Sequence, residues 1–221
     1  MRSAMVCAMA LALAACSALT APDHRDVAFS GSPGRSYLLV VAGPPETIDY
    51  TRYGGEETYV FERVDLASSK FLREYVFVAR DDSSKPKDGP RDEFLKPETM
   101  AASPFKFLGR SVATGEYALV EYVTRTQLAV HTDCFTLGSP VYRLQEGAIN
   151  IVPLGSAAAR THPDILKEQV ERLMTGYPAM AGPVVVAERL GLATYDTKQW
   201  LGKKTCFTRS PFTLEAAPAA N

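Results

Sequence analysis

The chain has little net charge and few of the residues that most often perform chemistry. Its 221 residues contain 24 Lys and Arg against 25 Asp and Glu, with only three His and four Cys. A near-neutral chain lacks the basic surface that nucleic acids require and the polybasic patch that attracts an anionic membrane. We therefore expect no nucleic-acid partner.

Common catalytic motifs are also missing. The sequence has no G-x-S-x-G elbow, no G-x-G-x-x-G loop and no G-x-x-x-x-G-K-[ST] loop, which hold a nucleophile or a phosphate in many enzymes. His131 and Asp133 would share one face of a strand and could begin a metal site, but His24 and His162 have no suitable neighbours. We expect no enzyme activity, no metal and no cofactor. A catalytic triad assembled from distant residues remains an alternative, because triads are recognised by geometry.

A hydrophobic run at the N-terminus is too short to cross a membrane. Residues 4–15 are all apolar and follow Arg2, whereas a spanning helix needs roughly 20 apolar residues. A basic start, a short apolar run and small residues before a cleavage point are typical of a secretory signal.

The end of this run, Leu13-Ala14-Ala15-Cys16, resembles the lipobox of bacterial lipoproteins at all four positions. The resemblance implies that the signal peptide, residues 1–15, is removed and that Cys16 becomes a lipidated first residue carrying acyl chains such as palmitate. Ser17 implies sorting to the outer membrane, with the chain facing the periplasm. Such chains hold a protein to a bilayer through about 0.8 kcal/mol per buried CH₂. An ordinary signal that is cut after Ala21 is the alternative.

The remaining cysteines form an even pair. Cys7 leaves with the signal and Cys16 carries lipid, which leaves Cys134 and Cys206 in an oxidising compartment. We expect a disulfide between them. It would close a loop of about 73 residues, and the chain-entropy model gives about 4 kcal/mol of stabilisation for such a loop.

The mature chain of about 200 residues suits one domain. Residues 16–35 have little periodicity, so we expect the lipidated Cys followed by a tether. Short runs rich in β-branched and aromatic residues then alternate with turn residues, which predicts strands up to residue 210. These runs begin with 36–42, 57–64, 73–79, 105–109 and a run from 115, and continue with 127–135, 141–144, 148–152, 183–187 and 203–209. They predict a mainly β domain, an antiparallel β-sandwich, over 36–210 and a disordered tail over 211–221.

One helix is expected over residues 163–175. Thr161 or His162 can cap it, Pro163 suits its first position, and Gly176 ends it. Its apolar stripe is formed by Ile165, Leu166, Val170, Leu173 and Met174. The spacing of these residues predicts a helix packed on the sandwich.

Three runs resemble a group of periplasmic lipoproteins with a transthyretin-like (prealbumin-like) sandwich. They lie at 115–119, 138–142 and 146–151, where a G-x-Y-x-L strand precedes an apolar hairpin with a turn at Glu146-Gly147 and then a helix. The resemblance implies a fold, and it carries no active site with it.

Two segments are candidates for contact with a partner. Tyr50, Arg52 and Tyr53 lie beside a Gly pair, and Tyr and Arg are enriched at protein contacts. Residues 80–103 form a long polar stretch, and connections of this length are often functional or disordered. We expect a lipid-anchored, non-catalytic binding module with an envelope protein as its partner. The alternatives are an envelope hydrolase and a carrier of a small ligand.

Overall fold

The described part of the chain forms two β-sheets, a separate hairpin and one helix. A computed structural model describes residues 28–42, 56–80, 106–125, 130–154, 162–200, 203–208 and 210–216. Over these residues the mainly β class is confirmed.

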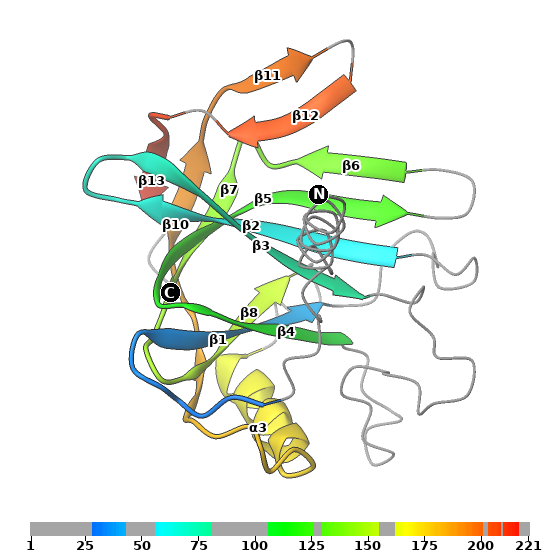
Figure 1. Ribbon diagram of the computed structural model, residues 1–221, viewed down its shortest axis with the longest axis vertical. Coiled ribbons are helices and arrows are strands. Elements are labelled where there is room, and N and C mark those ends of the chain that lie inside the picture. Colours follow the sequence, from blue (N-terminus) through cyan, green and yellow to red (C-terminus); the bar gives the residue numbers. More distant parts are fainter. Residues whose placement is uncertain are drawn as a thin grey trace, which may run out of the picture.

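The smaller sheet has four strands in the order β4-β1-β8-β9. These are β4 (Lys106–Ala113), β1 (Arg35–Ala42), β8 (Ile149–Leu154) and β9 (Val184–Val186). In the larger sheet, the order is β13-β10-β7-β5-β2-β3, and β6 pairs with β5 beside this path. Its strands are β13 (Thr213–Ala216), β10 (Glu188–Thr194), β7 (Ser139–Leu144), β5 (Gly115–Arg125), β2 (Glu56–Asp65), β3 (Lys70–Arg80) and β6 (Val130–Cys134). The hairpin of β11 (Thr197–Trp200) and β12 (Lys203–Thr208) is a two-stranded sheet of its own (Figure 1).

Strand β1 lies inside the domain, as its continuous apolar run predicts. Residues Tyr37 to Val41 are all 0 % exposed. The strand is antiparallel to β4 but parallel to β8, and β8 is parallel to β9. The expectation of an antiparallel fold is therefore wrong for this sheet. The physical reason is that β8 and β9 are joined through the helix, and a helical crossover produces parallel pairing.

Three apolar clusters divide the domain into layers. The first lies between the two sheets and includes Leu38 and Val40 of β1 with Phe61 of β2 and Leu119 of β5. A second cluster packs the opposite face of the smaller sheet against the helix, and a third covers the outer face of the larger sheet. Figure 1 shows this order, with the helix below the smaller sheet and the larger sheet above it.

The helix α3 (Pro163–Met174) confirms the sequence prediction. The His162 side chain accepts a hydrogen bond from the N–H of Asp164 at 3.3 Å and caps the first turn. Leu166, Val170 and Leu173 are buried against the smaller sheet. Ile165 was predicted to join this stripe, but it is 50 % exposed because it lies at the border of the apolar face.

The turn at residues 145–148 connects the two sheets. Gly147 has a φ of 68°, which suits glycine. The fully buried Asn150 accepts from the N–H of Gln145 at 2.7 Å and donates to the carbonyls of Gln145 and Ala148 at 3.0 and 2.9 Å. The predicted turn is present, but it is not a hairpin, since β7 and β8 belong to different sheets.

The expected tether is ordered from Phe29 onward. This ring is buried beside Tyr37, with centroids 5.7 Å apart. The N–H of Phe29 donates to Ala179 at 2.9 Å, and its carbonyl accepts from Ala181 at 2.6 Å. The tether prediction is therefore wrong for residues 29–35, because an apolar ring in this segment fills the layer beside α3.

The prediction of a disordered tail over 211–221 is also wrong for the described residues 211–216. Phe212 is buried, and β13 pairs antiparallel with β10. The Phe212 ring packs on Phe71 at 5.1 Å between centroids. Burial of this aromatic ring is the physical reason why residues 211–216 join the domain.

Gly109 packs directly against a fully buried aromatic ring of β1. A Cβ atom there would lie 2.4 Å from Cε1 and 2.7 Å from the hydroxyl of Tyr37, whose side chain is fully buried. We predict that Gly109→Ala lowers the unfolding free energy by about 1–3 kcal/mol, the usual cost of overpacking a core. Urea denaturation followed by circular dichroism measures the change.

Gly138→Ala is the matched control for this substitution. A Cβ atom there would meet Leu192 Cδ1 at an ordinary 3.6 Å. We expect its unfolding free energy to stay within about 1 kcal/mol of the wild-type value. An equal loss of unfolding free energy in both variants would show that the close contact between residue 109 and Tyr37 does not set the cost.

Candidate functional site

Several residues proposed from the sequence lie outside the described part of the chain. These are the lipidation residue Cys16 and the contact residues Tyr50, Arg52 and Tyr53. Of the stretch 80–103, only Arg80 is described, as the last residue of β3. Their roles stay predictions.

The predicted disulfide is present. Cys134 at the end of β6 is bonded to Cys206 in β12, with their Cα atoms 5.2 Å apart. Cys206 is buried and Cys134 is half-buried. The bond fastens the β11–β12 hairpin to the larger sheet.

Strand register places two glutamates on the outer face of the larger sheet beside this disulfide. Glu62 of β2 lies between Tyr75 of β3 and Ala118 of β5. Glu121 of β5 pairs with Val60 of β2 and with Cys134 of β6. The register between β2 and β5 shifts between Leu119 and Glu121. A bulge of this kind turns the following residue onto the other face.

The carboxyl group of Glu62 is fully buried, and it accepts hydrogen bonds from two other strands. The Thr208 hydroxyl of β12 donates to its Oε2, and the Arg73 N–H donates to its Oε1 at 2.9 Å. The Tyr75 hydroxyl is a third hydrogen-bond partner. Arg73 reaches this position with a φ of 58°, which is uncommon for a residue other than glycine.

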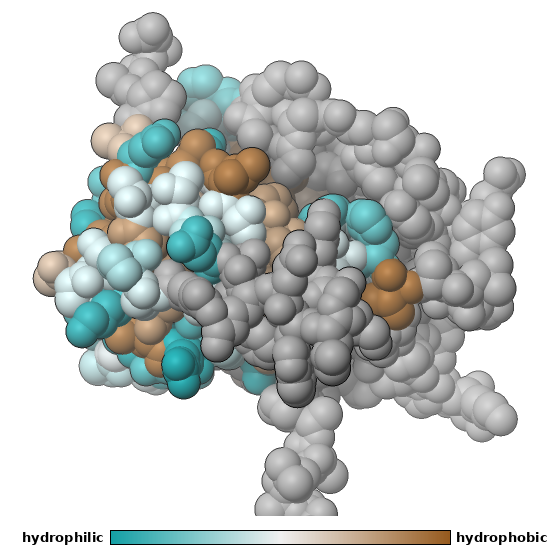
Figure 2. Space-filling model, turned by 90° about the horizontal axis from the view of Figure 1, so that it is seen from above, coloured by the Kyte–Doolittle hydropathy of each residue, from teal (hydrophilic) through white to brown (hydrophobic). Residues whose placement is uncertain are grey.

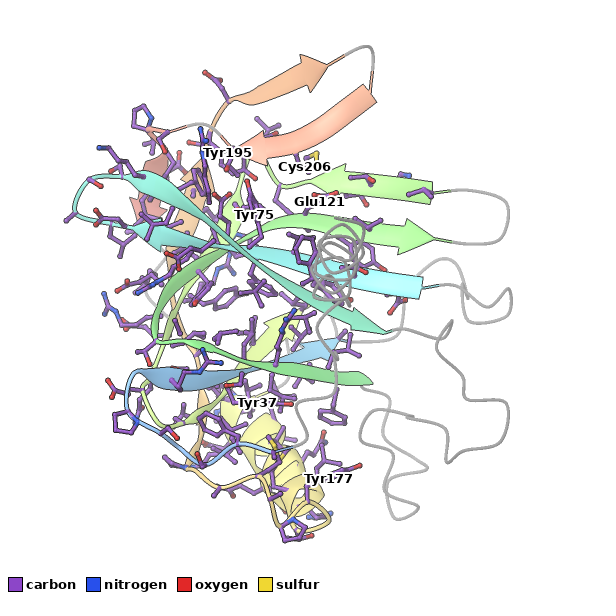
Figure 3. The ribbon with its side chains drawn as sticks, viewed as in Figure 1. Tyr37, Tyr75, Glu121, Tyr177, Tyr195 and Cys206 are labelled. Atoms are coloured by element: carbon purple, nitrogen blue, oxygen red, sulfur yellow. A yellow bond between two sulfur atoms is a disulfide. The ribbon has the colours of Figure 1, made fainter. Side chains whose placement is uncertain are left out.

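Tyr195 closes the cluster on the side of β10. Its ring packs edge-on against Phe71 at 4.9 Å between centroids, and its hydroxyl donates to the Val120 carbonyl at 3.4 Å. Figure 3 shows Tyr75, Glu121, Tyr195 and Cys206 gathered between the hairpin and the larger sheet. We term Glu62, Tyr75, Glu121, Tyr195 and Thr208 the outer-face cluster.

Burial sets the protonation behaviour of the outer-face cluster. It raises the pKa of Glu62 above its ordinary value, although the hydrogen bonds from Thr208, Arg73 and Tyr75 act in the opposite direction. Burial likewise raises the pKa of Glu121, and it is the main reason that the pKa of Tyr195 is raised. Folding therefore favours the neutral form of each of these groups more than exposure to water would.

The two described histidines lie away from the outer-face cluster. His131 Nε2 is 3.1 Å from Asp133 Oδ1, and His162 Nδ1 is 3.4 Å from Asp164 Oδ2. The side chains of His131 and His162 are 63 % and 68 % exposed. Within the described ranges, their hydrogen bonds join neither imidazole to a serine hydroxyl.

Two further searches cover the described residues only. No group of three or more His, Cys, Asp or Glu side chains there is arranged to hold a metal ion. No helix in this part of the chain has both the length and the hydrophobicity needed to span a bilayer.

A second feature lies where β1, β3, β5 and β8 end, which we term the loop end. The four strands finish there at Ala42, Arg80, Arg125 and Leu154. In Figure 1, β3 and β5 end on the right. Near it, the stacked rings of Tyr59 and Tyr122 have centroids 4.9 Å apart. Burial is the main cause that raises the pKa of Tyr59, and the negative charge of the nearby Glu57 is the second.

Comparison with known proteins does not place the chain in a family. No protein-family model, curated protein or solved structure matches it. The function must therefore be argued from the residues themselves.

The sequence prediction missed the outer-face cluster. One signal was present, because Glu62 alternates with Val60 and Val64 on the same face of a strand. An acidic residue between two apolar ones on one face indicates a buried carboxyl group. The partners of Glu62 could not be found this way, since Thr208 is 146 residues distant in the chain.

We predict that Glu62→Gln changes how stability depends on pH. A carboxyl group whose pKa is raised by folding stabilises the fold below its ordinary pKa, and this contribution is lost as the pH rises through the raised value. The unfolding free energy of the wild type should therefore decline from pH 4.5 to pH 8 by more than that of Glu62→Gln. Urea denaturation at several pH values measures both slopes.

Glu171→Gln, on the exposed surface of α3, is the matched control. It should keep the wild-type slope. If Glu62→Gln also keeps that slope, the buried carboxyl group does not titrate in this range.

Proposed function

We propose that this chain is a lipid-anchored protein of the bacterial cell envelope, located at the outer membrane and facing the periplasm. In this proposal its β domain is a non-catalytic binding module for an envelope protein. The observation that carries the proposal is the tetrapeptide Leu13-Ala14-Ala15-Cys16 after a short apolar run. The disulfide between Cys134 and Cys206 supports it, because such bonds persist in oxidising compartments.

The tether in this proposal is short. The chain is packed on the domain from Phe29 onward, so residues 17–28 alone separate the lipidated Cys16 from the domain. Twelve residues reach at most about 40 Å when fully extended. The domain would therefore stay within about 40 Å of the membrane surface.

We also propose that the two packed sheets are a variant of the transthyretin-like sandwich. The apolar cluster shared by both sheets supports a sandwich, as does the helix that follows β8. The variant would differ from an all-antiparallel sandwich through the β8-α3-β9 crossover.

The loop end is the proposed partner-binding region. Segment 43–55, which contains Tyr50, Arg52 and Tyr53, is joined to β1 and β2 at this end. Loops carried at one end of a rigid two-sheet scaffold are a common place for binding. The half-buried Tyr59 and Tyr122 would provide an aromatic base for such a contact.

The alternatives receive less support. A hydrolase would need a nucleophile beside His131 or His162, and both imidazoles are exposed and paired with aspartates two residues away. A carrier would need an apolar cavity of a few hundred Å³. The described side chains between the sheets pack against one another in one apolar cluster.

We predict that Cys16→Ser abolishes lipidation and cleavage before residue 16. The sulfur is the atom that would carry the diacylglyceryl group. Mass spectrometry of the purified protein and membrane fractionation measure the outcome, and Cys7→Ser in the same leader is the control. An unmodified wild-type chain that begins downstream of Cys16 would contradict the anchor.

We predict that combined substitution of Tyr50, Arg52 and Tyr53 by Ala lowers partner recovery at least tenfold. Crosslinking of intact envelopes followed by purification of the tagged protein measures this recovery. Lys167→Ala with Arg172→Ala, on the exposed surface of α3, is the control. Equal recovery from both variants would place the contact elsewhere.

A further inference from the structure

The β11–β12 hairpin is joined to the domain differently from every other described strand. Its two strands hydrogen-bond to each other, whereas the other strands belong to the two larger sheets. An isolated two-stranded hairpin is only marginally stable in water. Its position must therefore depend on ties other than a β-ladder.

Both ends of the hairpin are fixed on one residue, Phe71 of β3. Tyr195, just before β11, and Phe212, after β12, each pack against the Phe71 ring at 4.9 and 5.1 Å between centroids. Backbone contacts strengthen this base, since the N–H of Phe71 donates to Ser210 Oγ at 3.0 Å and that of Phe212 donates to the Ser69 carbonyl at 3.1 Å. These contacts hold the two ends of the hairpin on β3 without the disulfide.

Among the described residues, the disulfide from Cys206 to Cys134 ties the body of the hairpin to the sheet, and the Thr208 hydroxyl is hydrogen-bonded to Glu62 and Tyr75. Strand β12 contacts both β5 and β6. Its Thr208 is hydrogen-bonded to Glu62, and Figure 3 shows its Cys206 close to Glu121.

The edge of this face is apolar and exposed. Tyr75 and Phe77 of β3 are 39 % and 47 % exposed beside the buried Glu62. Figure 2 views the molecule from above and shows apolar residues next to hydrophilic ones on the described part of that view. Removal of the hairpin would extend the exposed surface from Tyr75 to Glu62 and Glu121.

We propose that the β11–β12 hairpin is a redox-controlled flap. While the Cys134–Cys206 bond is intact, the flap covers the Glu62 and Glu121 face of the larger sheet. After reduction it moves away about its fixed ends at Tyr195 and Phe212 and exposes that face. The Thr208–Glu62 hydrogen bond opposes this movement. The proposal does not depend on the lipid anchor or on the binding function proposed above.

The chemistry is thiol–disulfide exchange with a dithiol reductant. One thiolate of the reductant attacks the sulfur of Cys134, which is more exposed than Cys206, and Cys206 leaves as a thiolate that takes up a proton. The second thiolate of the reductant then attacks the mixed disulfide and releases Cys134. The protein gains two electrons and two protons, and the reductant becomes a disulfide.

Hydrogen exchange on the full chain in mild detergent tests the proposal. The chain is compared before and after treatment with dithiothreitol, and alkylation followed by mass spectrometry confirms that both thiols are free. We expect amide exchange in β11 and β12 to rise at least tenfold, while exchange in β1 and β8 changes less than twofold.

Two variants sharpen the test. Cys134→Ser should show fast exchange in the hairpin without any reductant. Thr208→Val should match the wild type while oxidised and should exchange at least twofold faster than the wild type once reduced. Unchanged hairpin exchange after full reduction would overturn the flap. An equal rise of amide exchange in β1 and β8 would also overturn it, because the disulfide would then stabilise the whole domain and not the hairpin alone.

Discussion

The architecture depends on covering both faces of one strand. Residues Tyr37 to Val41 of β1 are completely buried, and alternate side chains belong to different apolar clusters. Burial of each large apolar side chain is worth about 1.5–3 kcal/mol gross, so exposure of either face would be costly. The larger sheet covers one face, and α3 covers the other. The crossover that carries α3 also makes β8 and β9 parallel.

Buried polar groups fasten the connections between these layers. Asn150 is neutral, and its amide is bonded to the backbone of the turn that leads from one sheet to the other. Ser36 donates to the same turn, at the Gln145 carbonyl, over 2.9 Å. An unsatisfied buried polar group costs about 1–3 kcal/mol, so these bonds favour one course of the chain over others. Glu62 has a comparable role under the hairpin, but it can ionise, which makes that connection sensitive to pH.

Local patterns predicted part of the fold, and long-range pairing decided the rest. The apolar run of β1, the capped start of α3 and the cysteine pair were found because each signal is contained in a few residues. Strands β10 and β13 were missed. Gly191 interrupts β10, yet a Cβ atom there would lie 2.1 Å from the Glu215 carbonyl oxygen. Glycine at this position allows β13 to lie close, and only the paired structure shows that.

Periodicity and composition express the local preference of each residue, so they were enough to predict the apolar run of β1, the start of the helix and the pairing of two cysteines. The lipidation site at Cys16 and the contacts at Tyr50, Arg52 and Tyr53 also rest on sequence alone. The burial of Glu62 beneath Thr208 and the pairing of Glu121 with Cys134 became visible in the folded chain alone. Those contacts join residues far apart in the chain, and their geometry is set by strand register, which no local pattern contains.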